Sequence, residues 1–206
     1  MPRLGAVLLA AGCSSRFGGD NKLLAEVNGR PMVRVVANAI VDSGRFDEVV
    51  VVTGHDAPAI ERALTNLSVR FCFNADWHEG MGTSIALGIA EISTAVAGVA
   101  IVPADMPFIS QGLIESLASR FQELGSESII FPTTLAGDQR NPVIWPRRFF
   151  GLLEGLTGSE GGKRLLIELA QSRSAVVIAD DDVLLDIDAP DDMSDPSQAG
   201  QTNSQT

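Results

Sequence analysis

The sequence predicts an α/β fold built on a mostly parallel sheet. Short apolar runs rich in β-branched residues alternate with segments in which apolar side chains recur at helical spacing. The first run, 4–9, passes directly into a turn of small residues at 10–15. Alternating strands and helices are typical of parallel sheets, whose ligands bind at the carboxyl ends of the strands. We therefore look for a functional site in the segments that follow strands.

The individual elements follow from these patterns along the chain. Gly29-Arg30-Pro31 indicates a turn with proline at the first helical position, and Gly44 then ends the helix over 31–43. Further helices are expected over 58–67, 85–92, 111–124 and from 158–163 to 171. Strands are expected at 4–9, 48–53, 69–73, 98–102, 128–131, 143–145, 175–178 and 183–185.

The length of 206 residues is that of one α/β domain, which we expect to span 1–193. The last segment, 194–206, has no large apolar side chain, and we expect it to be a disordered tail. The apolar stretch near the N-terminus is shorter than a membrane-spanning helix and runs straight into a loop, so we do not interpret it as a signal peptide.

The net charge of −11 and the isoelectric point near 4.5 argue against a nucleic-acid partner and against binding to an anionic membrane. Only two cysteines occur, which makes a disulfide framework improbable and favours a reducing compartment. We expect a cytoplasmic protein.

The loop after the first predicted strand has the composition of a phosphate-binding loop. Its small residues around Gly12 would let backbone N–H groups approach an anion, and Arg16 and Lys22 add positive charge. An ordinary glycine-rich β–α turn is the structural alternative. Neither the Walker pattern nor the G-x-G-x-x-G dinucleotide pattern is present after Gly12, which disfavours a Rossmann oxidoreductase.

Carboxylates after later predicted strands are candidate metal ligands. Asp105 follows the strand at 98–102 and is flanked by two prolines, a position suited to Mg²⁺ that bridges nucleotide phosphates. Capping of the next helix is the alternative role. Asp186 and Asp188 alternate along the chain, so in a strand they would face the same side.

Several motifs in this order resemble the MobA-like NTP transferases, which attach nucleotides to the molybdenum cofactor. They are L-A-A-G-x-S-x-R-x-G followed by lysine, G-M-x-x-S at 80–84, P-A-D-M-P at 103–107 and L-D-I-D-A-P at 185–190. The resemblance covers about residues 4–193. It implies a Rossmann-like nucleotidyltransferase fold, a three-layer α/β/α sandwich with a mostly parallel sheet.

The resemblance also implies roles for individual residues. The catalytic residues would be Arg16, Lys22 and Asp105. Mg²⁺ would bind Asp105 and a second carboxylate, Asp188 in preference to Asp186. The nucleotide would contact Leu9, Ala10, Ala11, Gly12, Ser14, Arg16, Lys22, Asn74, Gly80, Met81, Ser84 and Asp105. Taken alone, 80–84 is equally compatible with a helix start capped by Thr83 or Ser84.

Two further segments resemble the family's acceptor-facing motifs. GDQRNPV at 137–143 supplies Asn141 and Pro142, with Arg140 where the family commonly has glycine. The segment 158–163 supplies Lys163, with Ser159 in place of an acid. A surface role for Lys163 is an equal alternative.

Within the family, L-A-A-G resembles the cytidylyltransferase branch, whereas guanylyltransferases usually carry L-A-G-G. The resemblance therefore implies transfer of CMP from CTP to the terminal phosphate of molybdopterin, with release of pyrophosphate. The product would be molybdopterin cytosine dinucleotide, the cofactor used by apo-enzymes of the xanthine-dehydrogenase family. The alternatives are a guanylyltransferase, a transferase acting on another phosphorylated acceptor, and a non-catalytic insertion factor for a molybdoenzyme.

Overall fold

The computed structural model of the protein describes residues 2–13, 21–159 and 161–187, which form a central seven-stranded sheet of order β5-β4-β1-β6-β8-β7-β9. The strands are β1 (Leu4–Ala10), β4 (Glu48–Thr53), β5 (Arg70–Phe73), β6 (Gly98–Pro103), β7 (Ile129–Thr133), β8 (Val143–Pro146) and β9 (Arg173–Val177). Every pairing in this sheet is parallel except those of β8, which runs antiparallel to both β6 and β7. The predicted α/β fold with a mostly parallel sheet is confirmed.

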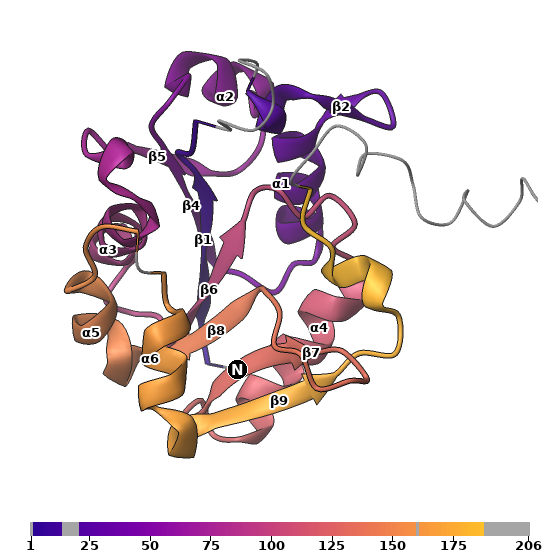
Figure 1. Ribbon diagram of the computed structural model, residues 1–206, viewed down its shortest axis with the longest axis vertical. Helices are drawn as coiled ribbons and strands as arrows, with labels where there is room; N and C mark the ends of the chain where they lie inside the picture. Colours follow the sequence, from indigo (N-terminus) through magenta and orange to yellow (C-terminus); the bar gives the residue numbers. More distant parts are fainter. Residues whose placement is uncertain (1, 14–20, 160, 188–206) are drawn as a thin grey trace, which may run out of the picture.

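Helices cover both faces of the sheet (Figure 1). One face carries α1 (Met32–Asp42), α2 (Ala57–Ala63) and α4 (Gln111–Glu123), and the other carries α3 (Met81–Glu91), α5 (Phe150–Glu154) and α6 (Lys163–Glu168). A small hairpin of β2 (Glu26–Val27) and β3 (Arg30–Pro31) precedes α1. The molecule is thus the three-layer sandwich that the resemblance implied.

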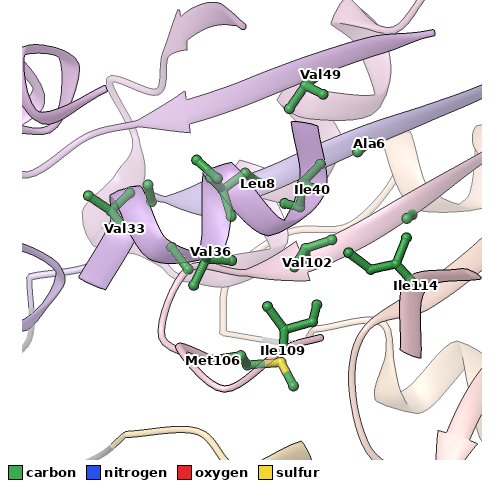
Figure 2. Packing of buried hydrophobic residues seen from close by; sticks show 14 of the residues in the cluster. Ala6, Leu8, Val33, Val36, Ile40, Val49, Val102, Met106, Ile109 and Ile114 are labelled. Atoms are coloured by element: carbon green, nitrogen blue, oxygen red, sulfur yellow. The ribbon is translucent and has the colours of Figure 1, made fainter. Parts of the chain in front are cut away.

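Each face of the sheet has its own apolar core. Strand side chains alternate between the two cores, so that Leu8 of β1 packs toward α1 while its neighbour Val7 packs toward α3. Figure 2 shows Leu8 beside Val36 and Ile40 of α1, which recur at the spacing of one helix face. Because β1 is buried on both faces, its side chains form a continuous apolar run.

Four details differ from the sequence-based expectation. Residues 183–185 are not a strand, since Asp181–Leu184 form a 3₁₀ turn. The helix expected to run to 171 is limited to α6, and a 3₁₀ turn, Ala170–Ser172, follows it. Pro31 belongs to β3 and precedes α1 rather than opening the helix. Helix α5 was not predicted, because five residues are too few to show a helical repeat.

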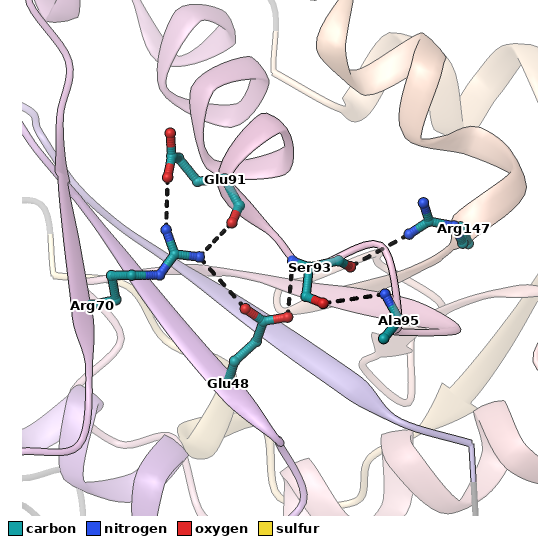
Figure 3. Close-up of polar contacts among 6 residues, drawn as sticks. All are labelled: Glu48, Arg70, Glu91, Ser93, Ala95 and Arg147. Carbon is teal, nitrogen blue, oxygen red and sulfur yellow. Dashed lines mark hydrogen bonds and ion pairs between the residues drawn. The ribbon is translucent and has the colours of Figure 1, made fainter.

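A polar cluster at the amino-terminal edge of β4 holds the end of α3 against the sheet (Figure 3). Arg70 of β5 pairs with Glu91 at 2.6 Å and with Glu48 at 3.5 Å, and it also donates to the backbone carbonyl of Glu91. The other Glu48 oxygen accepts from the backbone N–H of Ser93 at 2.9 Å. This cluster anchors the helix whose opposite end, at Met81, faces the candidate site.

Among the described residues, no helix is both long and apolar enough to cross a bilayer.

Candidate functional site

The candidate site lies at the carboxyl ends of β1 and β6. The chain crosses from β1 to β4 on one side and later returns to place β6 on the other side, so a crevice opens outside these strand ends. The backbone N–H of Ala104 donates to the carbonyl of Leu9 at 3.2 Å. This hydrogen bond holds the carboxyl end of β1 to the segment that follows β6. A pocket of about 270 Å³ opens there, and it includes the predicted residues Leu9, Met81, Asn141 and Lys163 in its lining.

Lys22 and Asp105, both predicted as catalytic, form an ion pair, and Asp105 lies between the pocket-lining residues Pro103 and Met106 in the chain. The Nζ of Lys22 lies 2.8 Å from Oδ2 of Asp105 and donates to the carbonyl of Ile187, also at 2.8 Å. The N–H of Ile187 in turn donates to the carbonyl of Asp105 at 2.8 Å. Three segments distant in sequence are joined here, and both ionic side chains are mostly buried.

The second oxygen of Asp105 has the properties of a metal ligand. Oδ1 is buried and has no hydrogen-bond partner among the described residues. A buried carboxylate oxygen without a partner is costly unless a cation or donor occupies its lone pairs. The chemistry of this oxygen fits Mg²⁺, which typically takes one or two protein carboxylates and completes its shell with phosphates and water.

The structure gives the second carboxylate a different setting from the one expected. Asp186 lines the pocket, but it follows a 3₁₀ turn rather than lying in a strand, so the alternation argument does not apply to it. Asp188 lies outside the described residues, and so do Ser14 and Arg16. Within 2–13, 21–159 and 161–187, no group of three or more His, Cys, Asp or Glu side chains is placed to hold a metal by itself.

The segment that follows β1 is hydrogen-bonded to the segment that follows β4. The backbone N–H of His55 donates to the carbonyl of Ala11 at 3.1 Å. A Cβ added to Gly54 would lie 2.9 Å from the Ala11 side chain and 2.6 Å from that of Trp77, so these segments approach as closely as glycine allows. Ala10 and Ala11 are buried, whereas Gly12 is exposed and has open space beside its Cα.

Asn74 organises the segment that leads into α3. Its Nδ2 donates to the hydroxyls of Thr83 and Ser84, each at 2.9 Å, and its Oδ1 accepts from the N–H of Asp76 at 3.0 Å. The side chain is buried. Asn74 and Ser84 are therefore brought together, and the structure uses the Asn74 amide to shape the loop. Neither Thr83 nor Ser84 caps the helix, which begins after Gly80.

Gly80 packs closely against Gly158 and Ser159, at the start of the second predicted acceptor segment. It has φ of 127°, and a Cβ there would lie 2.5 Å from the backbone carbonyl of Gly158. The N–H of Gly82 donates to that same carbonyl at 2.9 Å. This contact places Met81 at the pocket wall, beside Gly161.

The predicted acceptor residues converge on the same pocket from two segments. Asn141 precedes a cis peptide bond to Pro142, between β7 and β8, and Lys163 begins α6. The pocket also has lining residues outside the segments that sequence reasoning assigned to a site, notably Ile101, Trp145 and Leu166. Trp145 lies in a predicted strand, and its pattern gave no sign that the ring reaches a pocket.

Comparison with known proteins identifies relatives of this chain. The Bacillus subtilis purine catabolism protein PucB is 31% identical over 93% of this chain and 94% of its own length. A probable molybdenum cofactor guanylyltransferase of Haloferax mediterranei is 34% identical over 56% of this chain, which spans only about half (54%) of that relative.

The fold also matches solved structures. A nucleotidyl transferase from Methanothermobacter superimposes with a TM-score of 0.77 over 92% of this chain and 94% of its own, at 21% identity. Residues 6–175 match the family described as the MobA-like NTP transferase domain. The motifs at the strand ends, the three-layer sheet and these matches together show that the chain belongs to the MobA-like NTP transferase family.

Proposed function

We propose that the protein transfers CMP from CTP to the terminal phosphate of molybdopterin and releases pyrophosphate. The observation that carries the proposal is a pocket of mixed apolar and polar lining at the carboxyl ends of β1 and β6, with the Lys22–Asp105 pair at the end of the same strand β6. The pocket would take a ring-bearing acceptor, and the charged groups of the Lys22–Asp105 pair would lie toward the triphosphate. The family membership supports nucleotide transfer, and L-A-A-G at 9–12 supports CTP.

The reaction needs no strong general base, because a phosphate acceptor is already ionised. An acceptor oxygen forms a bond to the α-phosphorus of CTP, the bond from that phosphorus to the bridging oxygen breaks, and pyrophosphate leaves with the electron pair. The protein contributes position and charge neutralisation. Lys22 and Arg16, together with backbone N–H groups around Gly12, would hold the β- and γ-phosphates.

We assign Mg²⁺ to Asp105, with Asp188 as the preferred second ligand. Bound there, the ion would neutralise charge that develops on the phosphates. In the structure Lys22 occupies only Oδ2 of Asp105, and Oδ1 remains available in a buried position. Lys22 would therefore keep Asp105 oriented through one oxygen while the other binds the cation.

Molybdopterin as the acceptor rests on the family and on the pocket. The apolar part of the lining suits a flat heterocycle, and Asn141 and Lys163 add polar groups to the same pocket. PucB is named for purine catabolism, and xanthine is a purine, which supports an apo-enzyme of the xanthine-dehydrogenase family as the recipient of the product.

The deciding experiment measures pyrophosphate release from CTP, GTP, ATP and UTP with Mg²⁺ and molybdenum-loaded molybdopterin, with the dinucleotide identified by mass. We expect a CTP-selective signal that depends on the acceptor. The Haloferax relative makes GTP the second candidate, and GTP preference would retain the mechanism but reject the cytidylyl assignment. If none of the four nucleotides gives pyrophosphate release and the protein binds a molybdoenzyme tightly, the result would favour an insertion factor.

A further inference from the structure

The loop between β7 and β8 presents an arginine to the acceptor pocket on a backbone that is fixed by hydrogen bonds. The N–H of Arg140 donates to the carbonyl of Pro132 at 2.9 Å, and the N–H of Thr134 donates to the carbonyl of Asp138 at 3.0 Å. The hydroxyl of Thr134 also accepts from the N–H of Asp138 at 3.1 Å. Arg140 therefore starts from a defined position at the pocket wall.

The guanidinium of Arg140 is only weakly engaged by the protein. Its ion pair with Asp138 has an Nη2–Oδ2 distance of 3.9 Å, beyond hydrogen-bond range. Both side chains are well exposed, at 43% and 63%, and exposed pairs of this kind contribute little to stability. The planar donor group of Arg140 is thus available to a ligand.

The rest of the pocket defines what that ligand should look like. Trp145 is a buried residue of the pocket lining, and a Cβ on Gly162 would lie 3.0 Å from its indole ring. Lys163 lines the same pocket from α6, so two cations and an indole ring belong to one compartment, and Asp186 adds one acidic side chain. Such a compartment suits a flat ring that carries a phosphomonoester.

We propose that Arg140 is a specificity-determining residue which, with Lys163, binds the non-reacting phosphate oxygens of a flat phosphomonoester acceptor. This inference rests on the proposed function, because it concerns the acceptor of that reaction. Arginine binds phosphate through two parallel N–H donors, a geometry that lysine cannot reproduce.

The test compares molybdopterin with its dephosphorylated form. Binding is read from the fluorescence of Trp145 in the Trp77→Phe background, since these are the two tryptophans of the chain. We expect the phosphorylated form to bind at least 10-fold more tightly, and Arg140→Ala to remove most of this preference. Arg140→Lys should retain part of it. Arg120→Ala is the matched control, because Arg120 is similarly exposed, at 41%, on α4 and outside the pocket lining.

Turnover gives the second measurement. Arg140→Ala should raise the KM for molybdopterin about 10-fold or more and leave the KM for CTP unchanged. Equal weakening of both acceptor forms, an unchanged preference, or no binding of either form by the Trp77→Phe protein would overturn the role of Arg140. A clear phosphate preference without any nucleotide transfer would instead overturn the proposed function and leave the phosphate contact standing.

Discussion

The Nζ of Lys22 lies 2.8 Å from Oδ2 of Asp105, and the carbonyl of Ile187 accepts a second hydrogen bond from the same ammonium group. The pair couples the segment that begins at residue 21 to the carboxyl end of β6, and Ile187 adds the C-terminal segment. Because the pair is partly buried and hydrogen-bonded, each side chain restricts the other to one orientation. The ion pair therefore also fixes the position of Oδ1 of Asp105.

The first prediction concerns the role of Asp105 as a metal ligand. Asp105→Ala should lower turnover by roughly 10²–10³-fold, because a charge contact at the reacting phosphates is lost. Asp105→Asn keeps an oxygen that can accept from Lys22, so its thermal unfolding should match that of the wild type while its turnover falls. Steady-state kinetics over a Mg²⁺ titration checks this. Unchanged activity in both variants would contradict the assignment of Mg²⁺ to Asp105.

The second prediction concerns the C-terminal segment that carries Ile187. Ile187 is buried at 1% exposure, so Ile187→Ala should lower the free energy of unfolding by about 2–5 kcal/mol and reduce turnover by loosening the Lys22–Asp105 pair. Leu185→Ala is the matched control, since Leu185 is 41% exposed and should change little.

Truncation extends the same test to the domain boundary. A chain ending after Met193 should unfold and turn over like the full chain, whereas one ending after Ala179 should lose activity because Leu184 and Ile187 leave the core. Loss of folding on removal of 194–206 would contradict the predicted boundary.

The strands that were predicted well are those with a continuous apolar run. Residues 4–9 and 48–53 are buried on both faces of the sheet, which leaves a clear signal in the sequence. The short run at 143–145 predicted a strand but not its antiparallel direction, because direction depends on the connection rather than on residue type. The run at 183–185 has the same local character, yet it forms part of a 3₁₀ turn whose residue Leu184 packs into the core.

Residues of the candidate site could be predicted only where a single stretch of sequence contains a recognisable motif. Asp105 was found from the prolines beside it, and Lys22 from its place after a glycine-rich loop. Their mutual contact could not be found, since it depends on how β1 and β6 pair. The contribution of Ile187 was missed because it is made by backbone groups, which carry no residue-type signal.

The third prediction concerns Asn74, whose amide holds the hydroxyls of Thr83 and Ser84. Asn74→Ala removes the hydrogen-bond donor of the buried Ser84 hydroxyl and should cost about 1–3 kcal/mol of unfolding free energy. Ser84→Ala removes one of the same bonds, so the two effects should not add in the double variant. If Asn74 also borders the nucleotide, the KM for CTP should rise in Asn74→Ala. Strict additivity in denaturant unfolding would contradict the shared bond.

The fourth prediction concerns the two thiols. Burial, reinforced by Glu91 and opposed by Arg70, raises the pKa of Cys72 from 9.0 to about 11, whereas Cys13 is exposed. Because the thiolate is the reactive form, iodoacetamide at pH 8 should modify Cys13 and reach Cys72 only after unfolding. Peptide mass spectrometry with and without denaturant separates the two. Rapid modification of Cys72 in the folded protein would contradict the raised pKa.

The same shift predicts a pH dependence of stability. Between about pH 9 and 11 the unfolded chain releases the Cys72 proton while the folded chain keeps it. The free energy of unfolding should therefore fall as pH rises through this window, and Cys72→Ala should lack that part of the decline. Urea unfolding of both proteins at pH 8 and pH 10 measures the difference.

The last prediction concerns Gly80, where backbone conformation and close packing coincide. Gly80→Ala would force a residue with a side chain to adopt φ of 127° and would press its Cβ within 2.5 Å of the Gly158 backbone. The strain alone costs about 1–3 kcal/mol, and overpacking adds about 1–3 kcal/mol. Gly137→Ala is the matched control, because Gly137 has φ of 90° but nothing within 4 Å of an added Cβ. Gly137→Ala should lower the free energy of unfolding through backbone strain alone, without a contribution from overpacking.

The two variants separate stability from the geometry of the site. Since the Gly80 contact places Met81 at the pocket wall, Gly80→Ala should also raise the KM for the acceptor, in addition to lowering the melting temperature. Equal losses of stability in Gly80→Ala and Gly137→Ala would show that backbone strain acts alone and that Gly158 can move. A larger loss in Gly80→Ala, accompanied by weaker acceptor binding, would establish that the contact between α3 and 158–163 shapes the pocket.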